Sequence, residues 1–258
     1  MPQNLDLFPI GNCAVSALID RGGRFVWGCA PRIDSDPVFS ALLGGLEPGD
    51  PSAQGVWEVV VDGATSVEQN YLRNTPILRT VITDADGASV EVIDFAPRYQ
   101  QFGRSFRPTA FIRLIRPLTS VARITIRLRP TADWGARAAE HTHGSNHIRY
   151  LCSDMTLRLS TDGPVSHVLE ERTFRLEKPI AMYLGADEGF NADIGATCNR
   201  MLQQTQEYWM DWVRGLAVPL DYQSAVIRSA ITLKLCMALP GLTSTFLPET
   251  TLSPTFSR

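Results

Sequence analysis

The stretch that decides the fold covers residues 10–45 and reads IGNCAVSALIDRGGRFVWGCAPRIDSDPVFSALLGG. It holds two predicted strands, at residues 13–19 and 24–29, which are separated by the turn DRGG at residues 20–23. Glycine tolerates the positive φ that a tight turn between antiparallel strands demands. The stretch therefore predicts a β-hairpin near the start of the chain.

After the hairpin, the same stretch predicts a short helix at residues 37–43. Asp36 offers a carboxylate for the N-cap, and Pro37 suits the first helical position because it has no N–H to lose. Gly44 can end the helix in a left-handed conformation. We expect no other helix before residue 185.

Outside this stretch, composition sets broad limits. The 258 residues are 44% hydrophobic and 20% charged, which is typical of a soluble globular protein. A net charge of −3 argues against a nucleic-acid partner. No segment reaches the roughly 20 apolar residues of a membrane-spanning helix, and the N-terminus lacks a basic signal region. We expect a cytoplasmic protein with no membrane partner. Free, buried thiols are expected at the five cysteines, which lack CxxC spacing: Cys13, Cys29, Cys152, Cys198 and Cys236.

From residue 57 to residue 184, apolar side chains recur at every second position. Ile124, Ile126 and Leu128, for example, alternate with arginine and threonine, the pattern of a half-buried antiparallel strand. Many short strands of this kind predict a mainly β fold, a two-sheet antiparallel β-sandwich over residues 1–185. The strands are expected at residues 57–61, 77–83, 90–95, 123–129, 155–159, 173–176 and 180–184.

After residue 185 the apolar period changes to three and four. Residues 194–213 predict a linker helix within the segment 186–219. A second helix is predicted at residues 222–236, with Asp221 as its N-cap. Its apolar residues occupy most of the circumference, so it is expected to need neighbours on all sides. Residues 237–258, with three prolines and almost no charge, are expected to form a disordered tail.

Three histidines form the only spacing typical of a metal site. His141 and His143 would point to one face of a strand, and His147 follows closely. No fourth ligand is evident, and the run GSN at residues 144–146 favours a surface loop. We therefore assign no metal site.

Other candidate chemistries have equally simple structural explanations. Adjacent carboxylates at Glu170 and Glu171 would point to opposite faces of an extended chain, so they do not form a catalytic couple. No serine lies in a GxSxG turn, and no glycine pair lies in a nucleotide-binding motif, so no catalytic triad or cofactor site is assigned. Aromatic faces can stack on sugar rings, but core packing or coverage of a strand face is the simpler role for Trp27, Trp57 and Trp134.

Several segments, in order along the chain, resemble bacterial glycoside hydrolase family 15 proteins, which include glucoamylase-like and trehalase-like enzymes. The resemblance covers residues 5–236, with departures at Gly28 and Ala30. The segments that carry it are Ile10-Gly11-Asn12, the hairpin with Trp27, Pro31-Arg32-Ile33-Asp34-Ser35, Asp94-Phe95-Ala96-Pro97-Arg98, Asp133-Trp134-Gly135, Tyr208-Trp209-Met210-Asp211-Trp212-Val213 and the helix at 225–236.

The resemblance implies an N-terminal β-sandwich, a linker helix and, at residues 220–236, the first helix of an (α/α)6 barrel. In that family, two glutamates located later in the barrel hydrolyse an α-glucosidic bond with inversion. No position here corresponds to them, so the resemblance assigns no catalytic, cofactor-binding or metal-binding residue to this chain.

Three interpretations follow. The first is a truncated or frame-shifted, non-catalytic N-terminal part of a family 15 hydrolase, whose complete form would take an α-glucoside as substrate. The second is a stand-alone sandwich that binds an oligosaccharide or a protein partner. The third is an enzyme with an unrecognised site. In the first, the helix at residues 222–236 lacks its barrel neighbours and is expected to self-associate or to bind a partner's apolar groove.

Overall fold

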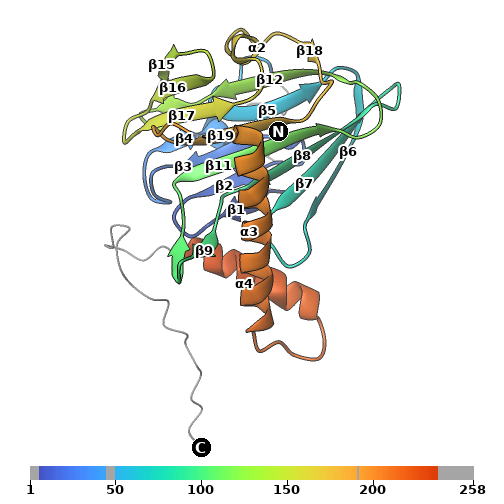
Figure 1. The fold of residues 1–258 in the computed structure, drawn as a ribbon, viewed down its shortest axis with the longest axis vertical. Helices are drawn as coiled ribbons and strands as arrows, with labels where there is room; N and C mark the ends of the chain where they lie inside the picture. Colours follow the sequence, from blue (N-terminus) through green and yellow to red (C-terminus); the bar gives the residue numbers. More distant parts are fainter. Residues whose placement is uncertain (1–5, 45–49, 191, 238–258) are drawn as a thin grey trace, which may run out of the picture.

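The computed structural model describes residues 6–44, 50–190 and 192–237. Two antiparallel sheets pack face to face, and two long helices follow them at the C-terminal end of the described chain (Figure 1). This architecture is the mainly β sandwich that the alternating strands predict. The tail expected at residues 237–258 lies, except for Met237, outside the described residues.

The first sheet has seven strands among the described residues, in the order β1-β2-β3-β5-β12-β18, with β4 also paired to β3. The predicted hairpin is present: Ser16 lies opposite Cys29 in register, and Gly23 has a φ of 79° in the turn. The bounds are Phe8–Gly11 (β1), Ser16–Ile19 (β2), Phe25–Cys29 (β3), Pro37–Phe39 (β4), Val56–Val61 (β5), Arg123–Arg129 (β12) and Phe174–Arg175 (β18).

The second sheet has eight strands among the described residues, in the order β15-β16-β17-β19-β11-β8-β7-β6. Every neighbouring pair is antiparallel. The sheet contains the strands predicted at residues 77–83, 90–95, 155–159 and 180–184. The strand predicted at residues 173–176 is β18 and belongs to the first sheet. The bounds are Ala64–Tyr71 (β6), Leu78–Asp84 (β7), Ser89–Phe95 (β8), Ala110–Pro117 (β11), Glu140–His143 (β15), His147–Leu151 (β16), Thr156–Thr161 (β17) and Ile180–Ala186 (β19).

Two short ribbons and four helices complete the described part of the chain. The ribbons pair Tyr99–Gln101 (β9) with Arg104–Phe106 (β10) and Thr131–Ala132 (β13) with Arg137–Ala138 (β14). The helices are Ala41–Gly44 (α1), Val165–Leu169 (α2), Ile194–Arg214 (α3) and Gln223–Cys236 (α4). No helix within the described ranges is long and apolar enough to cross a membrane.

The helix predicted at residues 37–43 is partly wrong. Pro37–Phe39 forms strand β4, which pairs with β3, and the helix begins only at Ala41. Pairing with β3 buries Phe39 completely, and its ring lies 5.4 Å from that of Phe25. This tertiary contact outweighs the local helix signals, since propensity is a weak prior.

Three other local expectations are wrong. The first hairpin strand begins at Ser16 rather than at residue 13, because the Asn12 Oδ1 atom accepts hydrogen bonds from the amides of residues 14 and 15. Helix α2 lies before residue 185, where no second helix is predicted, and it buries Val165 against the core. The N-cap of α4 is Tyr222, in a left-handed conformation, and not Asp221.

None of the five cysteines forms a disulfide, as the sequence predicts, but the predicted burial is wrong for two of them: Cys152 is half-buried and Cys236 is exposed. Cys13 and Cys29, on the two sides of the first hairpin, are both buried and do not form a disulfide. Burial raises the pKa of the Cys29 thiol to about 11, so this group stays protonated at neutral pH. Cys236, at the end of α4, is exposed.

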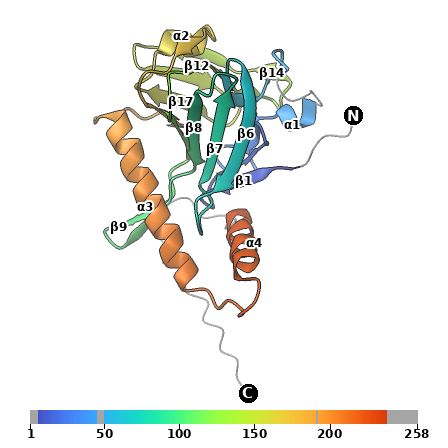
Figure 2. The same cartoon turned by 90° about the vertical axis from the view of Figure 1, so that its right-hand side faces the viewer.

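Helix α3 covers the outer face of the second sheet (Figure 2). Cys198 on the helix packs against Phe95, Ile112 and neighbouring apolar residues of the sheet. A second link is Arg98, which is 1% exposed. Its guanidinium donates to the Asn12 carbonyl over 2.9 Å and lies 4.6 Å from the centre of the Tyr208 ring on α3. The helix is thus fixed to the sandwich by both apolar and charged contacts.

Helix α4 has a neighbour on one side. Ile231 and Leu235 are buried in a cluster with Cys13 and with Trp209 of α3. The opposite side carries Leu233, which is 68% exposed. The expectation that α4 needs apolar contacts all round is therefore met on one side only.

A charged pair lies in the middle of the apolar layer between the two sheets. Asp94 of β8 and Arg113 of β11 are paired in register and both are completely buried. The Arg113 Nε atom donates to Asp94 Oδ1 over 2.7 Å, and Nη2 donates to Oδ2 over 3.0 Å. Burial raises the pKa of the Asp94 carboxyl, and the positive charge of Arg113 acts against that shift.

The same guanidinium reaches across to the first sheet. Its Nη1 atom donates to the carbonyl of Trp57 over 2.9 Å, and Nη2 donates to the carbonyl of Gly23 over 2.7 Å. Its central carbon lies 4.8 Å from the centre of the Phe25 ring and 5.0 Å from that of Trp57. Arg113 therefore binds the two sheets together through direct, charge-assisted hydrogen bonds.

We predict that Arg113→Met lowers the free energy of unfolding by about 3–5 kcal/mol, because it leaves the Asp94 carboxyl buried without its partner. The double variant Asp94→Leu/Arg113→Met should recover most of this loss, since it removes both charges. Urea denaturation measures both effects. Arg123→Met is the control, because Arg123 pairs with Asp62 on the surface and should change stability by less than about 1 kcal/mol. A loss at Arg113 as small as that of the control would contradict the role of the pair.

Candidate functional site

The turn between β13 and β14 has an unusual backbone. Asp133, Trp134 and Gly135 are three successive left-handed residues, with φ values of 55°, 58° and 87°. For residues other than glycine this conformation costs roughly 1–2 kcal/mol, because Cβ approaches the following carbonyl oxygen. Such strain persists only where the surrounding structure enforces it.

Asp36 enforces the conformation of this turn. Its Oδ2 atom accepts a hydrogen bond from the Asp133 amide over 2.7 Å, and its Oδ1 atom accepts one from the Trp134 amide over 2.7 Å. Asp154 holds Asp36 in turn, because its Oδ2 atom accepts the Asp36 amide over 2.9 Å. Three segments that are distant in sequence therefore meet at the turn.

The packing beneath the turn leaves no room for a side chain at residue 135. A Cβ atom on Gly135 would lie 2.6 Å from the Ser40 hydroxyl oxygen, so only glycine fits without displacement. That hydroxyl is hydrogen-bonded to Thr131 over 2.8 Å in a buried contact. The packing below the turn therefore requires glycine at position 135.

Asp133 is held as a carboxylate. Arg137 donates from Nε to Asp133 Oδ2 over 2.6 Å, and Ser153 donates from its hydroxyl to Oδ1 over 3.1 Å. These two hydrogen bonds, that of Arg137 above all, hold the pKa of the Asp133 carboxyl below its ordinary value of 3.8. Because the pKa is lowered in the folded state, the contacts of Asp133 stabilise the fold at pH values above the ordinary pKa of 3.8. This stabilisation is lost as the pH falls through the pKa of the folded state.

The three tryptophans named from the sequence have different environments. Trp57 is completely buried against Phe25 and Phe39, so core packing is confirmed for it. Trp27 is half-buried. For Trp134 the expected core packing is wrong, because its side chain is 63% exposed on the enforced turn. Of the three, Trp134 is the one whose ring could contact a ligand.

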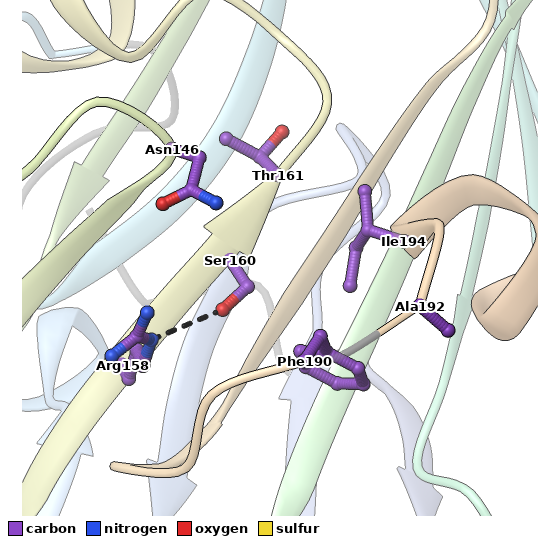
Figure 3. Close-up of a pocket in the computed structure, with 7 residues that line it drawn as sticks. All are labelled: Asn146, Arg158, Ser160, Thr161, Phe190, Ala192 and Ile194. Atoms are coloured by element: carbon purple, nitrogen blue, oxygen red, sulfur yellow. Dashed lines mark hydrogen bonds between the residues drawn. The ribbon is translucent and has the colours of Figure 1, made fainter.

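A separate small pocket lies beside the start of α3 and has a volume of about 130 Å³. Asn146, Arg158 and Ser160 face Phe190 and Ile194 across it (Figure 3). Arg158 donates to the Ser160 hydroxyl over 3.3 Å and also lies 3.6 Å from Asp187. The polar groups of the pocket therefore largely pair with one another. The remaining space suits a few water molecules or a small polar molecule. No sequence motif marks this pocket, because its residues come from several segments.

The histidine segment is a hairpin rather than the expected loop. His141 and His143 lie on strand β15 and His147 on β16, with residues 144–146 as the turn. A groove of about 630 Å³ separates His141 and His143 from α2. Within the described ranges, no three or more His, Cys, Asp or Glu side chains are grouped so that they could hold a metal ion.

The neighbouring carboxylates Glu170 and Glu171 have separate partners. Glu171 accepts from Arg129 over 2.6 Å and 2.7 Å, in a two-pronged pair that covers the outer face of β12. Glu170 pairs with Arg172 at the surface. The two side chains do not act as a couple.

Comparison with known proteins identifies the class to which this sandwich belongs. Residues 7–180 match the family model described as "Trehalase-like, N-terminal". The match covers most of the chain and almost the whole sandwich, so the chain belongs to the family of trehalase-like N-terminal domains.

Two curated relatives extend well beyond this region. The chain is 24% identical over 239 residues to a protein named trehalase from Thermoplasma volcanium, and the match covers 90% of the chain but 37% of the relative. It is 23% identical over 232 residues to a trehalase from Thermoplasma acidophilum, with coverage of 86% and 38%. The chain thus spans somewhat more than a third of the length of these relatives.

We predict that Trp134→Gly is more stable to urea than Trp134→Ala, by about 1 kcal/mol. Glycine adopts the left-handed conformation freely, whereas alanine keeps the strained Cβ. Neither variant should lose the stability that a core truncation loses, because the indole is mostly in water. A loss of about 3 kcal/mol or more in both variants, the size expected for a buried tryptophan, would instead make Trp134 part of the structural core.

Proposed function

We propose that this chain is the N-terminal, non-catalytic part of a glycoside hydrolase of family 15, of glucoamylase or trehalase type. The complete enzyme would hydrolyse an α-glucosidic bond with inversion. The observation that carries the proposal is the family match over residues 7–180 together with two trehalase relatives that are much longer than this chain.

In this proposal the sandwich domain comprises residues 1–185 and the linker helix lies within 186–219. Helix α4 is the first helix of the catalytic barrel, in the segment 220–236. The substrate of the complete enzyme is an α-glucoside, and no nucleic acid or membrane takes part. Five free cysteines support a reducing, cytoplasmic compartment.

The carboxylates around the exposed turn support a non-catalytic role for this part. Inverting hydrolysis needs one carboxyl group that donates a proton and a second that activates water, roughly 6.5–9.5 Å away. Asp36 is occupied by the amides of the turn, and Asp133 is bonded to Arg137 and Ser153. Groups engaged in this way are positioned to hold the turn rather than to transfer protons to a substrate.

An alternative function is that of a stand-alone sandwich that binds an oligosaccharide or a protein partner. The exposed indole of Trp134 favours it, because large aromatic side chains dominate the energetics of contact surfaces. Both functions are compatible with a site at the turn. The first requires a catalytic barrel in addition to this chain for hydrolysis, whereas the second is binding alone.

The activity assay distinguishes these functions. We expect no glucose release from trehalose, maltose or starch by the purified chain, because the barrel glutamates are needed for the reaction. A longer product that joins this chain to a complete barrel should release glucose. Turnover by the chain alone that disappears when one of its own carboxylates is replaced would contradict the proposal.

We also propose that the outer side of α4 mediates self-association. The large apolar side chains exposed on and beside this helix are Leu220, Tyr222, Leu233 and Met237. Burial of such surface is favourable by roughly 25 cal/mol per Å². We predict that Leu233→Ser shifts the protein towards monomer in light scattering, whereas Leu118→Ser, at an exposed site after β11, does not. A wild-type chain that is already monomeric at high concentration would refute this proposal.

A further inference from the structure

We propose that Trp134 is the stacking surface of a carbohydrate-binding site that takes one pyranose ring of a neutral gluco-oligosaccharide. The site consists of the indole and the polar groups beside it, Asp133, Arg137 and Asp154. The aromatic stacking site is inferred from the turn itself, and the choice of a glucose-containing sugar rests on the proposed function.

The Trp134 ring is exposed to water on a strained segment of the backbone. Trp134 is 63% exposed and left-handed, and its amide is fixed by the Asp36 carboxylate over 2.7 Å. Strained residues that the surrounding structure enforces tend to occur at ligand-binding positions. Because the backbone is already fixed, a ligand that stacks on the ring does not have to order the turn.

The surroundings of the turn are polar. The Asp133 and Arg137 side chains are 57% and 46% exposed, and Asp154 is also at the surface. An exposed aromatic side chain on a turn that also carries exposed carboxylate and guanidinium groups suits a sugar. The C–H face of a pyranose packs on the ring, while its hydroxyls donate to the carboxylates and accept from the guanidinium.

An apolar protein segment fits this surface less well. The groups that hold the turn from the sides are Asp36, Asp154, Ser153 and the Asp133–Arg137 pair, and all of them are polar. The centre of a protein interface is usually depleted in charged residues. The exposed apolar side chains of α4 are, by contrast, the surface that suits a protein partner.

The turn and α4 are also far apart in the fold. Figure 2 shows β14 beside α1 in the upper half of the sandwich, whereas α4 lies at the lower end. Sugar binding at Trp134 and self-association through α4 can therefore be altered independently of one another.

The test is a calorimetric titration of the full chain with maltohexaose and with trehalose. We expect saturable binding of at least one of the two sugars, with affinity lowered about tenfold or more by Trp134→Ala, which corresponds to the loss of one stacked ring. Trp134→Phe keeps a smaller flat ring and should retain part of the affinity. Phe102→Ala is the matched control, since Phe102 is 90% exposed and also left-handed, and it should bind like the wild type.

Two results would overturn this inference: no binding of either sugar by the wild-type chain, or equal affinity in the wild type and in Trp134→Ala. Loss of self-association in Trp134→Ala without an effect on sugar binding would also overturn it, because it would make the indole a protein contact. The outcome is separate from that of the activity assay. Glucose release by the longer product does not require binding by this chain, and binding does not require hydrolysis.

Discussion

The buried guanidinium of Arg113 is the interaction on which the rest of the structure depends. It forms a two-pronged pair with Asp94 inside one sheet and donates to carbonyl groups of Trp57 and Gly23 in the other. A charge in an apolar interior is tolerated only when its hydrogen-bonding groups are matched. Both sheets must therefore be in their correct relative position before Arg113 is satisfied. The pair therefore fixes the relative position of the two sheets rather than adding net stability over an apolar core.

A sandwich fixed in this way can carry strain at its surface. The left-handed turn at Trp134 is enforced by Asp36, next to β4, and by the turn between β16 and β17 that contains Asp154. These segments belong to different sheets, so their relative position depends on the packing between the sheets. The core thereby determines the geometry of a surface site. The turn that carries Trp134 is held by polar contacts, and the indole itself is 63% exposed.

The sequence predicts the strands well because their signal is local, an alternation of apolar and polar residues. It fails where a distant contact decides the outcome. Residues 37–39 have the signals of a helix start but form a strand, because pairing with β3 buries Phe39. Asp94 and Arg113 occupy inward positions that a pattern of apolar residues cannot assign to charged side chains. The turn is similar: Trp134 is recognisable as a candidate, but Asp36 lies 98 residues away and no local spacing connects the two.

We infer that the Asp94–Arg113 pair makes the two sheets one cooperative unit. Native-state hydrogen exchange at increasing denaturant measures this, because it reports the free energy at which each strand opens. We expect the slowest amides of β5 in the first sheet and of β8 and β11 in the second to converge on a single opening free energy, that of global unfolding. Exchange of one sheet at a clearly lower free energy than the other would show that the sheets open separately, and would contradict the claim.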